Sequence, residues 1–346
     1  MSEARDSMAT AIAGLGNQIR FALADTTLAQ LPDYDFDSIE VGAMGGSALA
    51  WDVLNETMGH KLNGALRIHR DYSLTQVSPD SLGIACSISG NTEETLAAYE
   101  MMREQCKCVI AITAGGELAK RAESDSVELI RVPLENEPSD FQPRNSVGYL
   151  LTYGARLLQA TGIGANLVGE IEAAVIDYDN HCDGIEDRAK ETAQWINGNI
   201  PIVYSSASLF NSLARTMKIK FNENAKYPAF AGALPEINHN EMIGFESDIG
   251  TGFRIIYLSD PGDSDAVRNR FSTMSRLFEE RNITHVQTRK IDLSGDTRLG
   301  RVLGGISFGD WCSYHLAILR RVDPTPVDFI EDFKAELAKT RSFTRG

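Results

Sequence analysis

Short apolar runs alternate with helix-like stretches along the first half of the chain. Runs rich in Ile, Val and Ala predict buried strands at residues 38–43, 66–72, 83–87, 108–113 and 127–132. The segments between them, at about residues 47–58, 92–105 and 117–123, are predicted to be helices. Strands that alternate with helices indicate a parallel sheet that is covered on both faces.

The second half follows a similar plan after a helical connector. A polar loop at residues 133–143 precedes a predicted helix at 144–161, and residues 163–197 look helical and polar. Further strands are expected at 200–205, 253–258 and 285–291, and further helices at 263–280, 301–320 and 327–339. The sequence therefore predicts an α/β fold of two doubly wound parallel-sheet domains. We expect an N-terminal helical segment at 1–34, a first domain at 35–165, a helical connector at 166–195 and a second domain with C-terminal helices at 196–346.

Composition narrows the class of protein. A chain of 346 residues is long enough for two cores, and 43% hydrophobic with 23% charged residues is typical of a globular protein. The formal net charge of -15 argues against a nucleic-acid partner, which would require a basic surface. Residues 1–20 contain no long apolar block, so we expect no signal peptide, no membrane partner and a cytoplasmic location.

Cysteine and histidine spacing gives no metal signature. The five cysteines are scattered, and Cys106 and Cys108 have no second Cys or His pair nearby. The six histidines also lack ligand spacing. We expect neither a metal site nor a cofactor.

Two glycine- and hydroxyl-rich segments follow predicted strands. Residues 43–48 (AMGGSA) follow the first strand and residues 87–95 (SISGNTEET) follow the third, and each leads into a helix. Backbone N–H groups at helix starts and neutral hydroxyls suit a phosphate dianion. The candidate phosphate-binding residues are Gly46, Ser47, Ser87, Ser89 and Thr92. Helix capping by Thr92, or by a pair formed by Asn91 and Glu94, is the alternative, but four hydroxyls at two strand ends favour an anion site.

Polar residues interrupt the apolar sequence at residues 222–245. One reaction of a phosphorylated sugar that such groups can serve is aldose–ketose isomerisation, which requires a base over two adjacent carbons, usually a carboxylate, and an acid–base group that opens the sugar ring. Glu223 is the natural base and His239 the natural ring-opening group, while Glu236 and Glu241 compete with Glu223. Lys226 is interpreted as a solvated or structural cation.

Seven motifs run in order along the chain. They are MGGS at 44–47, SISGNTEETL at 87–96, TAGGELA at 113–119, PRNSVGYLL at 143–151, NENAK at 222–226, PEINHNEMIGF at 235–245 and VDPTPV at 322–327. With them the chain resembles the bifunctional phosphoglucose/phosphomannose isomerase family of the sugar-isomerase-domain superfamily. NENAK followed by PEINHNE is the most specific part of the resemblance.

The resemblance implies an activity and a set of roles. It implies cofactor-free interconversion of glucose 6-phosphate and mannose 6-phosphate with fructose 6-phosphate through a cis-enediol. Glu223 would transfer the proton, Arg144 would stabilise the enediolate, and Lys334 and His239 would act in ring opening. The family's active site lies at a homodimer interface, so His239 would come from the neighbouring subunit. Thr325 is a candidate for sugar specificity, since it is short at a place near C1 and C2.

The chain also departs from the family pattern. Ala43 and Ala114 replace a usual Gly and Ser, and Trp51 stands where the family has a small residue, so we expect Trp51 to narrow the pocket. The alternatives are a non-catalytic phosphosugar-binding regulatory protein, an isomerase for another sugar phosphate, or an amidotransferase-type isomerase half. The presence of Glu223, His239, Arg144 and Lys334 together favours the isomerase.

Overall fold

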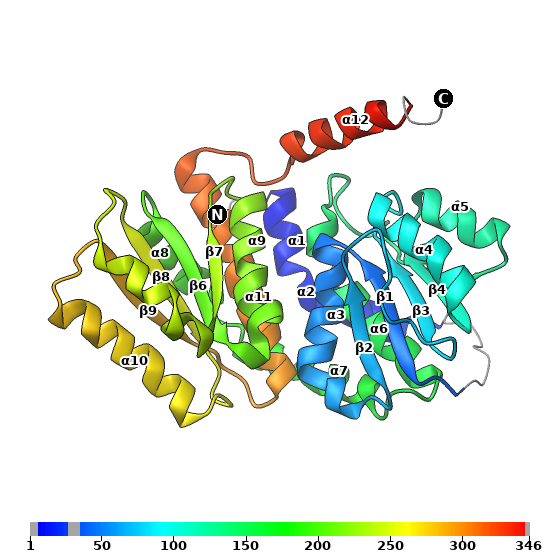
Figure 1. The fold of residues 1–346 in the computed structure, drawn as a ribbon, viewed down its shortest axis with the longest axis horizontal. Coiled ribbons are helices and arrows are strands. Elements are labelled where there is room, and N and C mark those ends of the chain that lie inside the picture. Colours follow the sequence, from blue (N-terminus) through cyan, green and yellow to red (C-terminus); the bar gives the residue numbers. More distant parts are fainter. Residues whose placement is uncertain (1–5, 27–34, 343–346) are drawn as a thin grey trace, which may run out of the picture.

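Two parallel β-sheets, one in each half of the chain, form the framework of the molecule (Figure 1). A computed structural model describes residues 6–26 and 35–342. The first sheet has the order β2-β1-β3-β4-β5 and the second has the order β7-β6-β8-β9. The strands are β1 (Ser38–Ala43), β2 (Ala65–His69), β3 (Leu82–Cys86), β4 (Cys108–Thr113), β5 (Glu128–Arg131), β6 (Ile200–Ser206), β7 (Phe230–Leu234), β8 (Phe253–Ser259) and β9 (Val286–Asp292). All neighbouring strands in both sheets run parallel, which confirms the predicted fold class.

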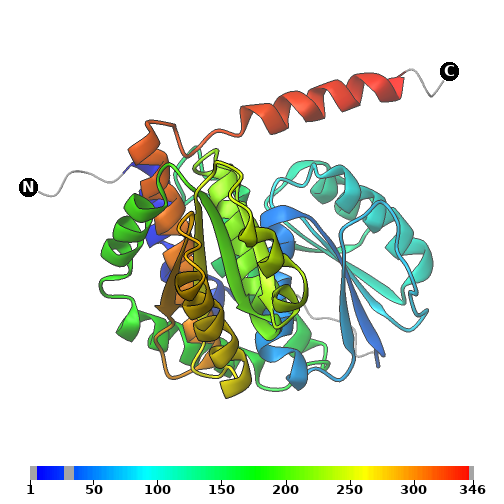
Figure 2. The ribbon, with the colours of Figure 1, turned by 60° about the vertical axis from the view of Figure 1, so that its left-hand side comes forward.

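Helices cover both sides of the first sheet. They are α3 (Gly45–Met58), α4 (Glu93–Gln105), α5 (Gly116–Ser124) and α6 (Val147–Ala160). Helix α3 faces the second lobe, and α4 and α5 lie on the opposite side (Figures 1 and 2). All six residues of β1 are buried, because strands of a parallel sheet between helix layers have no solvent face.

The two lobes share one apolar core. Helices α1 (Ser7–Ala13), α9 (Thr216–Glu223) and α11 (Arg298–Arg320) lie between the sheets (Figure 1). Ile39 of β1, Leu213 just before α9, and Phe308 of α11 belong to the same buried cluster. The other helices of the molecule, apart from the last one, are α2 (Leu15–Ala24), α7 (Leu167–His181), α8 (Ile185–Ile196) and α10 (Asp265–Glu280). This shared core fixes how residues from the two lobes face one another.

The last helix crosses from one lobe to the other. Helix α12 (Asp328–Ser342) follows α11 of the second lobe and extends above the first lobe (Figure 2). No helix within the described residues has both the length and the apolar character that crossing a membrane requires.

Most predicted elements are confirmed, and two were missed. Strands β1 and β4 have the predicted bounds, and the other predicted strands differ only at their ends. Strand β7 was not predicted, and neither was helix α9. The helix expected from residue 144 begins with a 3₁₀ turn, Pro143–Asn145, before α6. Parts of the predicted N-terminal segment, residues 1–5 and 27–34, lie outside the described residues, and the domain boundaries stay a prediction.

Candidate active site

A cavity of about 470 Å³ opens at the carboxyl ends of β1 and β3. Its walls come from the loops after these strands, from the segment before α6, from the end of α9 and from the first turns of α12. Of the sequence-predicted site residues, it gathers Gly46, Ser47, Ser87, Ser89, Thr92, Arg144, Glu223 and Lys334. Ligands bind at this edge in open α/β sheets, so the position agrees with a binding site.

The hydroxyl groups of the two loops form a cluster. The Oγ atom of Ser87 lies 3.0 Å from Oγ1 of Thr92 and 3.5 Å from Oγ of Ser89. The Oγ of Ser47 accepts a hydrogen bond from the backbone N–H of Ile88 at 3.2 Å, which joins the two loops. The side chain of Thr92 makes no capping hydrogen bond at the start of α4. The Oγ atoms of Ser87 and Ser89 accept from the backbone N–H groups of Gly90 and Asn91, so the cluster is held by the loop before α4 and lines the cavity.

Asn91 also does not take part in the predicted capping pair with Glu94. Its Oδ1 instead accepts from the backbone N–H of Glu117, at the start of α5. Gly90 has a left-handed φ of 66°, and a Cβ there would lie 1.8 Å from the carbonyl oxygen of Gly115. Because Gly90 has no Cβ, the hydroxyl-bearing loop packs directly against the turn before α5.

Gly46 brings Arg144 against the first loop. A Cβ at Gly46 would lie 2.6 Å from Cα of Arg144, so only glycine permits this approach. The Arg144 side chain is 3% exposed. Burial lowers the pKa of Arg144, and the nearby carboxylates of Glu223 and Asp310 oppose that shift. A guanidinium remains charged in this setting, and it brings a fixed positive charge to the cavity.

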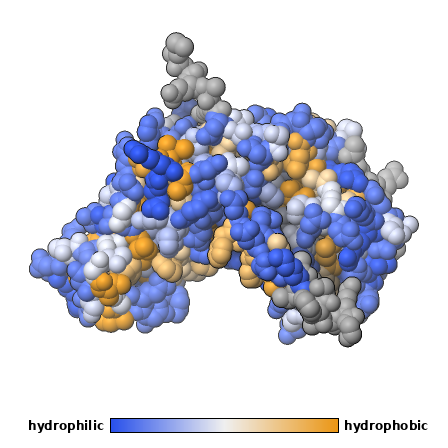
Figure 3. Space-filling model, turned by 90° about the horizontal axis from the view of Figure 1, so that it is seen from above, coloured by the Kyte–Doolittle hydropathy of each residue, from blue (hydrophilic) through white to orange (hydrophobic). Residues whose placement is uncertain are grey.

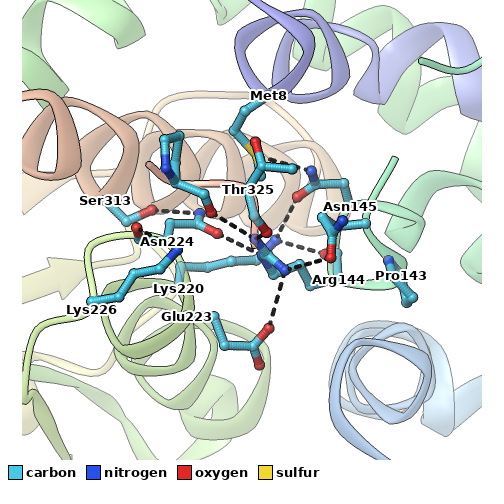
Figure 4. A network of polar contacts seen from close by, with 12 residues as sticks. Met8, Pro143, Arg144, Asn145, Lys220, Glu223, Asn224, Lys226, Ser313 and Thr325 are labelled. Atoms are coloured by element: carbon cyan, nitrogen blue, oxygen red, sulfur yellow. Dashed lines mark hydrogen bonds and ion pairs between the residues drawn. The ribbon is translucent and has the colours of Figure 1, made fainter. Parts of the chain in front are cut away.

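Glu223 is the carboxylate that faces Arg144. It is the last residue of α9, and its Oε2 lies 3.7 Å from Nη1 of Arg144 (Figure 4). Glu236 and Glu241 do not line this cavity. Glu236 accepts from Asn240, and Glu241 accepts from the hydroxyl of Tyr204. Among the three candidates for the base, the structure places only Glu223 beside the hydroxyl cluster.

The two predicted ring-opening groups lie in different places. Lys334 of α12 lines the cavity and pairs with Glu331 at 2.7 Å. His239 ends a 3₁₀ turn, Glu236–His239, after β7. It is exposed and lines a separate pocket with Met242 and Leu277. Within one chain, His239 is therefore not part of the cavity that holds Glu223.

Two further expectations concern the cavity wall. The expectation that Trp51 narrows the pocket is wrong, because its side chain is buried in the core and its ring packs on Gly154. The Thr325 side chain does not line the cavity, but its backbone carbonyl accepts from Nη2 of Arg144 at 2.8 Å. The Lys226 side chain is exposed overall, which agrees with a solvated cation. Partial desolvation of its ammonium group and the positive charge of Arg144 lower its pKa.

Sequence reasoning missed the residues that hold Arg144. Gln142 lines the cavity, and its Oε1 accepts from Nη1 of Arg144 at 3.1 Å. Asn224 accepts from Nε at 2.6 Å. Asn224 lies in the NENAK motif, which gave a signal, whereas nothing in the local sequence marks Gln142.

Within the described residues, one group of side chains is close enough to hold a metal ion. It consists of Asp177, His181 and Asp296, none of which lines the cavity. The Asp177 carboxylate already accepts from the backbone N–H groups of Asp296 and Thr297. This group is explained by its role in holding the loop before α11.

Comparisons with known proteins agree with the geometry. Residues 185–337 match the family model for the bacterial phospho-glucose isomerase C-terminal SIS domain. A bifunctional phosphoglucose/phosphomannose isomerase of Aquifex aeolicus is 32% identical over 299 residues, which cover 86% of this chain and 89% of that one. A D-glucosamine-6-phosphate 4-epimerase of Sulfolobus acidocaldarius is 34% identical over 219 residues, 63% of this chain and 67% of that one.

A solved structure supports the fold. The C-terminal domain of glucosamine-fructose-6-phosphate aminotransferase from Francisella tularensis superposes with a TM-score of 0.70 at 13% identity, covering 93% of this chain and 98% of that one. The fold, the order of the motifs and the identity over most of the length agree: the chain belongs to the bifunctional phosphoglucose/phosphomannose isomerase family.

Proposed function

We propose that the protein interconverts glucose 6-phosphate and mannose 6-phosphate with fructose 6-phosphate. One observation carries the proposal: a single cavity combines a cluster of neutral hydroxyls with Arg144, Glu223 and Lys334. The hydroxyls of Ser47, Ser87, Ser89 and Thr92, with the backbone at Gly46, would hold the phosphate. The sugar chain would then extend toward Glu223 and Arg144.

In this proposal Glu223 moves the proton between the two carbons. Its carboxylate removes the hydrogen of C2 and returns it to C1, while O1 gains a proton and O2 loses one, so that the aldose becomes a ketose. Loss of the C2 proton gives a cis-enediolate, which carries negative charge on oxygen until that oxygen is protonated to the cis-enediol. Arg144 is buried and preorganised, so its positive charge and the N–H group of Nη1 that faces the cavity would stabilise that charge with little reorganisation.

Ring opening would use groups from two subunits. Lys334 would act at the end of the sugar that reaches α12, and the partner subunit's His239 would act at the ring oxygen. His239 is exposed and lines one pocket with Ile243, which is 66% exposed, and Ile249 of the same lobe is 69% exposed. Phe329 of α12 is 87% exposed, and apolar patches lie on both lobes in the view from above (Figure 3). Large apolar side chains that are exposed on both lobes suit a protein interface, which supports a homodimer with the active site at that interface.

Both epimers would be substrates because they give the same enediol. The specificity candidate Thr325 presents its backbone carbonyl to Arg144 and does not line the cavity, so we assign its hydroxyl no role in selecting one configuration at C2. We expect turnover of the two aldoses to agree within a factor of roughly ten, which corresponds to about 1.4 kcal/mol in the barrier.

A coupled assay tests the proposal. Glucose 6-phosphate and mannose 6-phosphate are supplied separately, fructose 6-phosphate is detected, and each run is repeated with a chelator. We expect activity with both sugars and no loss with the chelator, because the sequence has no metal-ligand spacing. Turnover of only glucose 6-phosphate would contradict the bifunctional assignment, and tight binding without turnover would favour a regulatory protein.

The role of the base is tested by Glu223→Gln. Gln keeps the shape of the side chain and removes the base, so we expect kcat to fall by about 10² or more with little change in affinity. Glu236→Gln is the matched control, since Glu236 does not line the cavity. If Glu223→Gln retains wild-type turnover while the control does not, the base has been assigned to the wrong residue.

Epimerisation at C4 is a second candidate reaction. It is favoured by the 34% identity to the D-glucosamine-6-phosphate 4-epimerase, which is limited to 63% of this chain. Incubation with glucosamine 6-phosphate, followed by separation of the two C4 epimers, distinguishes it from isomerisation. We expect no second epimer.

A further inference from the structure

A second buried ion pair lies behind Arg144, and the proposed reaction does not use it. Lys220 of α9 is 1% exposed, and its Nζ lies 2.6 Å from Oδ1 of Asp310 on α11. Burying such a pair costs more free energy than its attraction returns in many proteins, and apolar residues of the same volume would often serve as well. The pair therefore calls for an explanation beyond stability.

Lys220 holds the backbone at Arg144. Its ammonium group has three N–H donors. It donates to the carbonyl oxygen of Arg144 at 2.7 Å and to Oδ1 of Asn145 at 3.4 Å, and its charge pairs with the carboxylate of Asp310. Lys220 belongs to the second lobe and Arg144 to the first, so these bonds fix the segment before α6 against α9.

Asn224 holds the guanidinium group of Arg144. It is the C-cap residue of α9, four residues after Lys220, and is fully buried. Its Oδ1 accepts from Nε of Arg144 at 2.6 Å, and its Nδ2 donates to Oγ of Ser313 at 2.9 Å. Ser313 donates in turn to the carbonyl oxygen of Asp310. Helix α11 therefore supports both Lys220 and Asn224.

The hydrogen bonds of Arg144 leave one direction open. Nε donates to Asn224, Nη2 donates to the carbonyl oxygens of Pro324 and Thr325, and Nη1 donates to Gln142 (Figure 4). A guanidinium has five N–H groups, so four are engaged. The remaining one belongs to Nη1, the atom that lies 3.7 Å from Glu223. The arrangement presents a single donor to the cavity, next to the proposed base.

We propose that Lys220 and Asn224, supported by Asp310, are positioning residues that aim this one N–H of Arg144 at the reacting oxygen of the substrate. Lys220 and the proposed base Glu223 lie on α9, and Asn224 follows directly as its C-cap residue, so the end of one helix sets the distance between the guanidinium and Glu223. The inference rests on the proposed function, in which Arg144 stabilises the enediolate.

The experiment compares Asn224→Ala with Asn224→Asp. We expect Asn224→Ala to lower kcat roughly 10- to 100-fold, since small displacements of catalytic groups are this costly. KM should change by less than about threefold, because the hydroxyl cluster that would hold the phosphate is untouched. Asn224→Asp keeps an acceptor for Nε and should recover most of the lost kcat. A purely structural role would lower thermal stability without this split and without rescue by Asp.

Matched variants keep the outcome clear. Asn222 belongs to the same motif but donates to the carbonyl oxygen of Tyr227, so Asn222→Ala should leave kcat unchanged. The double variant Lys220→Met/Asp310→Leu replaces the pair by apolar groups, so it should remain folded and still lose kcat. If it folds and keeps wild-type kcat, Lys220 does not position Arg144.

Arg144→Lys separates the two hypotheses. An inactive wild-type protein rejects the proposed function itself. If wild-type turnover is present and Arg144→Lys lowers it, but Asn224→Ala does not, only the positioning inference fails.

Discussion

The loop after β3 and the loop after β8 occupy corresponding places in the two sheets. Each follows the strand beside the first strand of its lobe, and each leads into a helix on the outer side. In the first lobe this loop carries Ser87, Ser89 and Thr92, which are neutral donors. In the second lobe it carries Asp260 and Asp263, which are buried carboxylates.

The carboxylates of Asp260 and Asp263 accept hydrogen bonds from the donors that a bound anion would otherwise use. Asp260 accepts from the N–H of Gly262 and from Nε of Arg301, and Asp263 accepts from the N–H of Asp260 and from the hydroxyl of Tyr257. The side chains of both loops make hydrogen bonds within the protein, but the second loop is closed by buried carboxylates, whereas the hydroxyls of the first loop line a cavity. The comparison teaches that the same strand–loop–helix plan supports either binding or stability, and that a few loop residues decide which.

The largest effect is expected from removing the hydroxyls of the first loop. A hydrogen bond to a charged group contributes about 1.5–3 kcal/mol, so Ser87→Ala/Ser89→Ala should weaken phosphosugar binding by roughly 10² to 10⁴-fold. Titration calorimetry with fructose 6-phosphate measures the affinity, and circular dichroism checks the fold. Ser206→Ala, at the corresponding edge of the second sheet, is the control and should not change the affinity. Equal affinity before and after the double change would mean that these hydroxyls only shape the loop.

The first of these two loops could be predicted from the sequence, whereas the buried carboxylates of the second were not. The hydroxyl-rich segment was recognised because four small polar side chains followed two predicted strands. Strand β7 was missed because its sequence, FAGAL, has small residues and only one aromatic residue, so local preference for a strand is weak. Pairing with β6 supplies what the local sequence lacks.

The candidate site was less predictable, because it depends on contacts between distant segments. Glu223 and His239 are close in sequence, yet only Glu223 lines the cavity. Arg144 and Lys334 were identified through the family resemblance alone, and Lys220 gave no signal at all. An exposed lysine and a fully buried one look alike in a sequence, and only the fold distinguishes them.

The second prediction tests the stabilising role of the second loop. Asp260 is 2% exposed and pairs with Arg301 at 2.6 Å. Removing one partner of a buried pair leaves an uncompensated charge, so Asp260→Ala should lower the free energy of unfolding by about 3–5 kcal/mol. Urea denaturation measures this loss, and KM of the folded variant should be unchanged.

Asp265→Ala is the matched control for Asp260→Ala. It removes a carboxylate of the same loop region that pairs with Arg268 but is 88% exposed, and exposed pairs contribute about 0–1 kcal/mol. If both variants lose the same stability, burial of Asp260 does not explain its effect. The loop after β8 would then have no special role in stability, and the two loops would differ in sequence alone.

The smallest expected effect concerns the first strands of the two lobes. Glu40 lies in the middle of β1 and is fully buried, whereas β6 has no charged residue. The Glu40 carboxylate accepts from Nη1 of Arg67 at 2.6 Å and from Oγ of Ser38 at 3.0 Å, and lies 2.7 Å from Nε2 of His69. Burial raises the pKa of Glu40, but the hydrogen bonds from His69, Ser38 and Arg67 outweigh it and hold the pKa below its ordinary value of 4.5.

The sign of the pH dependence follows from this lowered pKa. A carboxyl group that is more acidic in the folded than in the unfolded protein adds stability above its unfolded pKa and loses it as pH falls through the folded pKa. Glu40→Gln should therefore lower the free energy of unfolding by about 1–2 kcal/mol at pH 7, with the exposure of Arg67 keeping the loss modest. The difference from wild type should shrink as the pH falls below 4.5, the ordinary value for Glu40. Glu123→Gln, which removes an exposed partner of Arg131, is the control and should change little at any pH. Urea denaturation across this pH range measures both variants, and a difference for Glu40→Gln that does not depend on pH would show that its charge does not stabilise the first sheet.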